Sequence, residues 1–138
     1  MRRLLLAALL VLGMPMLAQA AGNQGADDQG PDHQYLYYRD LNVPPFQSLR
    51  EFFDLPNRVG SYEVTLVSEA VGPLTFKVMR VRGDREVTLK QYRSYHIHDH
   101  EFHLKFDNTD GQADLMVAIA NSNPAASAKV TVIVVQLP

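Results

Sequence analysis

The feature that most constrains the fold is a two-residue alternation of apolar side chains that begins near Gly60 and recurs along the rest of the chain. Four segments place apolar residues at every second position: Tyr62, Val64 and Leu66; Leu74, Phe76 and Val78; Phe102, Leu104 and Phe106; and Leu115, Val117 and Ile119. Because successive side chains of a β-strand point to opposite faces, this period favours half-buried strands. A further segment, KVTVIVVQL at 129–137, is almost wholly β-branched and apolar, and predicts a strand buried on both faces.

Turn-forming sequences separate these segments. Asn-Thr-Asp-Gly at 108–111 is the strongest, because its residue types favour tight turns. Short strands with turns every roughly 8–12 residues are typical of antiparallel sandwiches and barrels. The sequence therefore predicts a mainly β protein, a small antiparallel β-sandwich of about seven strands in which two layers cover each other's apolar faces.

One short helix is expected before these strands. Pro45 suits a first helical turn, because proline lacks the backbone N–H that would have no partner there, and Pro56 ends the run. Between the two prolines, apolar residues recur at helical spacing: Phe46, Leu49, Phe52 and Phe53. The pattern predicts an amphipathic helix over about 45–54 that packs its phenylalanines on the sheet, after a short strand near 35–38.

The first residues have the organisation of a secretory signal peptide. Arg2 and Arg3 precede an apolar run at 4–17 that is shorter than the roughly 20 residues of a membrane-spanning helix. The small residues of AQA at 18–20 then form a cleavage signature. The sequence predicts a signal peptide over 1–20, a periplasmic or secreted protein, and no membrane span.

The remaining chain divides into a tail and one domain. Residues 21–34 contain no large apolar side chain, so nothing offsets the entropy of ordering them, and we expect a flexible tail. Residues 35–138 are expected to form a single domain that has no cysteine and therefore no disulfide. The net charge of −2 argues against a nucleic-acid partner, because nucleic-acid binders need a basic surface.

No catalytic pattern stands out in the sequence. It has no cysteine nucleophile, no nucleophile elbow and no glycine-rich phosphate loop. We therefore expect a binding module rather than an enzyme. A locally basic stretch at 77–93 has the charge to contact an acidic partner or a glycan, or to form a solvated hairpin face.

The stretch YHIHDHEFHL at 95–104 contains four of the five histidines of the chain. As one continuous strand, it would mix apolar and polar side chains on both faces. As a hairpin that turns at Asp99-His100, it places Tyr95, Ile97, Phe102 and Leu104 on one face and His96, His98, Glu101 and His103 on the other. The cleaner separation favours the hairpin.

The hairpin has a chemical consequence. Opposed side chains on one face have Cβ atoms about 4.5–5.5 Å apart, so three imidazoles and a carboxylate would converge. We predict a transition-metal site, for zinc or copper, formed by His96, His98, Glu101 and His103, with His100 or Asp99 as substitute ligands. A solvated hairpin with incidental histidines and a pH-sensing cluster remain alternatives.

Two functions follow from these patterns. The first is an exported, non-enzymatic binding module that holds a transition metal through the histidine-rich hairpin. The alternative is a cell-envelope protein–protein interaction module, such as an inhibitor, an immunity protein or an accessory subunit, in which no metal takes part.

Overall fold

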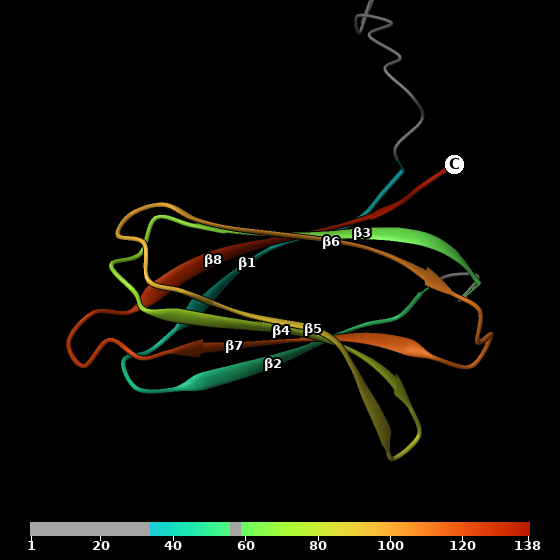
Figure 1. The fold of residues 1–138 in the computed structure, drawn as a ribbon, viewed down its shortest axis with the longest axis horizontal. Helices are drawn as coiled ribbons and strands as arrows, with labels where there is room; N and C mark the ends of the chain where they lie inside the picture. The colour runs from blue at the N-terminus through green and yellow to red at the C-terminus, as the bar shows by residue number, and fades with distance from the viewer. Residues whose placement is uncertain (1–33, 56–58) are drawn as a thin grey trace, which may run out of the picture.

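Two facing antiparallel sheets make up the part of the chain that the structure describes (Figure 1). The structure, a computed structural model, describes residues 34–55 and 59–138, and these residues form eight strands and no helix. The strands are β1 (Gln34–Val43), β2 (Ser48–Phe53), β3 (Gly60–Ser68), β4 (Leu74–Arg82), β5 (Arg85–Ser94), β6 (His100–Asn108), β7 (Asp114–Asn121) and β8 (Ala128–Gln136). The predicted mainly β sandwich is confirmed.

The strand order follows a nested pairing. Sheet A has the order β1-β8-β3-β6 and sheet B the order β2-β7-β4-β5. The first strand thus pairs with the last, the second with the seventh, the third with the sixth and the fourth with the fifth. This connectivity is that of an eight-stranded jelly roll.

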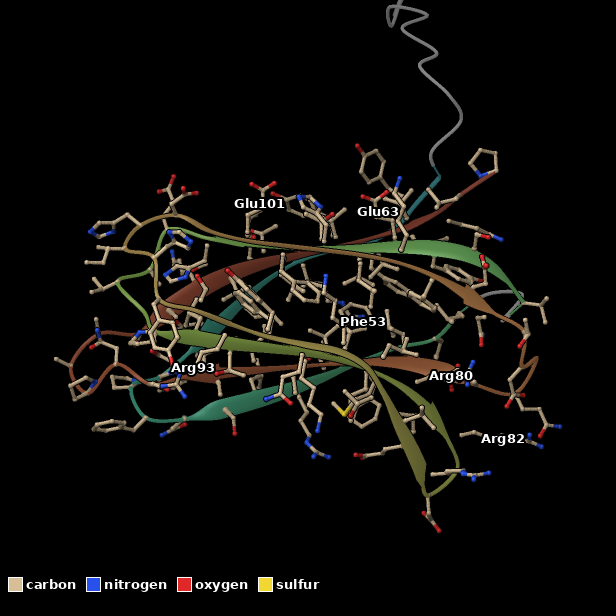
Figure 2. All side chains as sticks on the ribbon, in the orientation of Figure 1. Phe53, Glu63, Arg80, Arg82, Arg93 and Glu101 are labelled. Carbon is tan, nitrogen blue, oxygen red and sulfur yellow. The ribbon has the colours of Figure 1, made fainter. Side chains whose placement is uncertain are left out.

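The core lies between the two sheets, as the alternation of apolar residues predicts. Every second residue is buried in β3 from Tyr62 onward and in β4 from Leu74 to Val78. Phe53 of β2 lies between the layers in Figure 2. The prediction for β8 is wrong on one point. Its outward residues, which include Thr131 and Ile133, are only half-buried, because no described layer covers the outside of sheet A.

The predicted helix over 45–54 is wrong. A turn occupies 44–47, and Ser48–Phe53 then forms β2, which pairs with β7. The helical spacing was misleading because it counted Phe46 and Phe52, which are 72% and 55% exposed, together with the buried Phe53. Phenylalanine also suits strands well, and pairing with β7 decides the conformation.

The connections gather at two ends of the sandwich (Figure 1). The loop end carries the four connections 44–47, 69–73, 95–99 and 122–127, each of which joins one sheet to the other. The hairpin end carries the β4–β5 hairpin and the β6–β7 turn. The predicted signal peptide (1–20) and all but the last residue of the predicted tail (21–34) lie outside the described residues. Within the described parts of the chain, no helix is long and apolar enough to cross a membrane.

Candidate functional site

The predicted histidine hairpin is wrong. Strand β5 ends at Ser94 in sheet B, β6 begins at His100 in sheet A, and residues 95–99 cross between the sheets. The partner of β6 is β3, so His103 lies opposite Thr65 rather than opposite His96. A strand distant in sequence provides the pairing that the prediction had assigned to a local turn.

His100 is a buried part of the loop end. Its Nε2 lies 2.9 Å from the Ala70 carbonyl oxygen and its Nδ1 lies 2.6 Å from Ser94 Oγ. A carbonyl oxygen only accepts, so Nε2 carries the proton, and in the neutral ring Nδ1 accepts from the Ser94 hydroxyl. His100 thus joins β6, β5 and the 69–73 connection, and both of its nitrogens are occupied.

His98 is held in a different way. Its backbone has a φ of 58°, an uncommon left-handed conformation for a residue with a side chain. The backbone N–H of His98 donates to the backbone carbonyl oxygen of Ala70 at 3.1 Å. The ring Nδ1 donates to the backbone carbonyl oxygen of Glu69 at 2.8 Å. These two bonds fix both the backbone and the ring. In the neutral ring, the proton on Nδ1 leaves Nε2 as an acceptor, and Nε2 has no hydrogen bond to any described residue.

Glu101 and His103 lie together on the outer face of sheet A, where Figure 2 also shows Glu63. His103 Nε2 donates to Glu101 Oε1 at 2.5 Å, and its Nδ1 lies 3.0 Å from Thr65 Oγ1. His96 is exposed in the crossing segment instead. The structure therefore brings Glu101 and His103 together and leaves His96 apart. No group of three or more His, Cys, Asp or Glu side chains in the described ranges could hold a metal ion.

A cleft lies beside these residues where β3 ends and β6 begins. Its volume is about 440 Å³, and we call it the histidine cleft after its lining residues: Val67, Ser68, Glu69, His98, Asp99, His100, Glu101, Lys129 and Thr131. Three carboxylates and one ammonium group line it. The cleft is therefore acidic and polar, and it suits a cation or a ligand rich in hydrogen-bond donors.

The cleft contains residues that the sequence analysis missed. Lys129 and Thr131 come from β8, and Glu69 follows β3, so only the sheet order brings them next to the histidine stretch. Ser68 Oγ donates to the Lys129 oxygen at 2.6 Å and joins these two elements at the cleft. No local sequence signal could have identified them.

The chain matches no known protein-family model and no curated protein. Among solved structures, the crystal structure of PirA is similar, with 19% sequence identity and a TM-score of 0.48. The similarity covers 78% of this chain and 100% of that chain. A similarity at this level gives no information on ligand or activity.

Proposed function

We propose that this chain is an exported, non-enzymatic binding module and that the histidine cleft is its ligand site. The observation that carries this proposal is the conformation of His98. Its backbone is in the strained left-handed region, and two hydrogen bonds hold the backbone and the ring in place. Strained residues persist where the surroundings over-determine them, and they cluster at binding sites. Here the strain presents one basic ring nitrogen whose orientation is fixed before any ligand arrives.

A transition-metal ion, zinc or copper, is the first ligand to test. Metal-binding histidines nearly always donate their second ring nitrogen to a carbonyl or carboxylate, as His98 does to Glu69. Of the predicted ligands, His98 and Glu101 line the cleft, as do both substitutes, Asp99 and His100. Since both nitrogens of His100 are occupied, we assign His98 Nε2 as the nitrogen ligand. Carboxylates of the cleft would have to move to it to complete a metal site, because no three such groups in the described residues are placed to hold an ion.

Calorimetric titration of the metal-free protein with zinc and copper salts tests this assignment. We expect one-to-one binding that His98→Ala weakens at least about tenfold, since partners of a ligand alone account for that much. His96→Ala is the matched control, because His96 lies in the same segment but does not line the cleft. Equal weak binding by both variants would show that the histidines capture metal non-specifically.

The absence of catalysis is also part of the proposal. The described chain does contain a serine–histidine pair, Ser94 and His100, but they are 0% and 2% exposed. The His100 proton is directed to a backbone carbonyl, so the pair has no access to a substrate. Export rests on the predicted signal peptide, and mass spectrometry of the mature protein would locate the cleavage after residue 20.

A cell-envelope protein partner is the second candidate, and one observation favours it. The loop end exposes large apolar side chains from three connections: Phe46, Val71, Tyr95 and Ile97. Phe46 has a φ of 55°, and its N–H donates to the Asn123 oxygen at 3.1 Å, so a braced backbone presents an exposed aromatic ring. Exposed apolar side chains gathered at one place mark interaction sites.

Pull-down from envelope extract tests this second candidate. A protein that the wild type retains and Phe46→Ser/Ile97→Ser loses would support it. Phe52→Ser is the control, since Phe52 is exposed on sheet B, away from the loop end. Retention that is identical for all three proteins would exclude the loop end as the contact surface.

A further inference from the structure

The β4–β5 hairpin extends beyond the sandwich at the end opposite the histidine cleft (Figure 1). Gly83 and Asp84 form its two-residue turn, and Gly83 has the positive φ, 56°, that such turns need. An irregularity in the pairing after Val78 precedes the projecting part, and residues 82–88 are exposed. The tip of the hairpin therefore contributes little to the core.

One face of this hairpin carries three arginines. Arg82 lies directly opposite Arg85, and Arg80, two residues earlier on the same side, lies opposite Val87. Opposed side chains have Cβ atoms about 4.5–5.5 Å apart, and like charges placed there repel. The hairpin thus places three arginine side chains on one face, where their like charges oppose one another.

Few carboxylates offset this charge. Glu86 lies opposite Val81, on the other face of the hairpin, and it pairs with Arg50 of β2 at 3.1 Å. Asp110 of the β6–β7 turn lies 3.2 Å from Arg82. Among the described residues, Arg80 and Arg85 form no ion pair with any carboxylate.

The three arginines line a hollow of about 280 Å³ between the hairpin and the β6–β7 turn, together with Val87 and Asp110. We call it the arginine hollow. Figure 2 labels two of its lining residues, Arg80 and Arg82, at the hairpin end. Its volume is several times the roughly 30 Å³ that a water molecule occupies in the liquid. A small polyatomic anion fits within it.

One arginine is held in place by the neighbouring β6–β7 turn. Arg82 donates to Asp110 at 3.2 Å and to Gln112 Oε1 at 3.0 Å, which fixes the direction of its guanidinium. Both terminal nitrogens of Arg82 are thus in use, and Arg80 and Arg85 are the lining arginines that have no ion pair with a described residue. By contrast, Arg39 pairs with Glu51 and Arg50 pairs with Glu86.

We propose that the arginine hollow binds a phosphate or sulfate group. Guanidinium groups donate paired hydrogen bonds to such tetrahedral anions, and a bound dianion relieves the repulsion between the three arginines. The group can be free in solution, part of a sulfated glycan or part of a lipid headgroup, and the chemistry is the same. This site is separate from the histidine cleft, so either can fail without the other.

Titration with inorganic phosphate and with sulfate at about 20 mM ionic strength, followed by the NMR signals of the arginine Nε–H groups, tests the site. We expect the Nε–H signals of Arg80 and Arg85 to shift and saturate. We also expect Arg85→Gln to weaken anion binding about tenfold, which is the loss typical of one charge-assisted hydrogen bond. Arg93→Gln is the control, because Arg93 lies on the same strand at the loop end. Absence of saturation, or equal weakening by both variants, would overturn the proposal.

Two further titrations separate the sources of the anion. Heparin fragments represent sulfated glycans, and vesicles that contain phosphatidic acid represent a lipid headgroup. The source is the probe whose affinity exceeds that of inorganic phosphate and depends on Arg85. If neither probe does so, a free anion is the ligand. All variants are checked by thermal unfolding, where exposed substitutions change little.

Discussion

The loop end and the hairpin end differ in whether their polar side chains have hydrogen-bond or ion-pair partners within the protein. At the loop end the buried side chains are saturated: Asn121 Nδ2 donates to the oxygens of Val43 at 3.1 Å and Ala126 at 2.8 Å, and His100 bonds through both nitrogens. At the hairpin end, Arg80 and Arg85 have no described ion-pair partner. The buried polar side chains of the loop end are therefore used within the fold, whereas two arginines of the hairpin end have no such partner.

The largest effect should come from His100→Ala. The substitution leaves a cavity, removes the partner of Ser94 Oγ and removes one of the two donors to the Ala70 carbonyl, so we expect the free energy of unfolding to fall by about 3–4 kcal/mol. His103→Ala removes an exposed histidine with as many hydrogen bonds and should cost about 0.5 kcal/mol. Urea denaturation measures both.

If His100→Ala and His103→Ala lost similar amounts of unfolding free energy, the contrast between the buried loop end and the exposed outer face would be wrong. Similar losses would mean that the outer face of sheet A depends on its polar side chains as much as the loop end does. His100→Asn gives a second reading, because a smaller amide keeps some hydrogen bonding and should recover part of the lost stability.

The second effect concerns Gly72, which packs against the His100 ring. A Cβ at Gly72 would lie 2.6 Å from His100 Cε1, and its φ is +69°. We expect Gly72→Ala to cost about 2–3 kcal/mol, part from the backbone and part from the clash. Gly83→Ala shares the positive φ, +56°, but meets nothing within 4 Å, so it should cost about 1 kcal/mol.

The difference between the two glycine variants isolates the contact with His100. In the double variant Gly72→Ala/His100→Ala the clash is gone, so the combined cost should be less than the sum of the single costs by about 1 kcal/mol. Strict additivity in urea denaturation would show that the ring does not determine the need for glycine at position 72.

Much of the fold could be predicted from the sequence, because local alternation reports burial directly. Strands β3, β4, β6 and β7 lie where their apolar residues alternate. Strand β2 was mistaken for a helix because Phe46 and Phe52 complete a helical stripe, although both are exposed. Exposure of a large aromatic side chain is a property of the assembled surface, and no local pattern reveals it.

The candidate site could be predicted only in part, for a related reason. From His100 onward, alternate residues such as Phe102 point inward and His103 points outward, which is the continuous-strand pattern for this half of the stretch. The hairpin separates polar from apolar residues across 95–104. This separation is misleading because the segment crosses from sheet B to sheet A and does not pair with itself. Lys129 joins the cleft through the order β8-β3-β6, a long-range pairing that a sequence alone does not specify.

The smallest effect concerns Asp110. Removing its charge should lower stability slightly and should strengthen phosphate binding. The backbone hydrogen bond from Gln112 holds the pKa of Asp110 below its ordinary 3.8, with desolvation opposing and the charges of Arg82 and Arg80 assisting. The folded state thus favours the ionised carboxylate. Its contribution to stability is complete above the unfolded pKa and is lost as the pH falls through the lower, folded pKa.

Asp110→Asn should therefore lower the thermal midpoint slightly at neutral pH, and the difference from wild type should shrink below about pH 4 and vanish in stronger acid. The asparagine oxygen still accepts from the Gln112 N–H, so the variant removes mainly the charge. The same change takes the one carboxylate from the arginine hollow, so phosphate should bind severalfold more tightly. Weaker phosphate binding would show that Asp110 acts chiefly by orienting Arg82, and tighter binding that its charge competes with the anion.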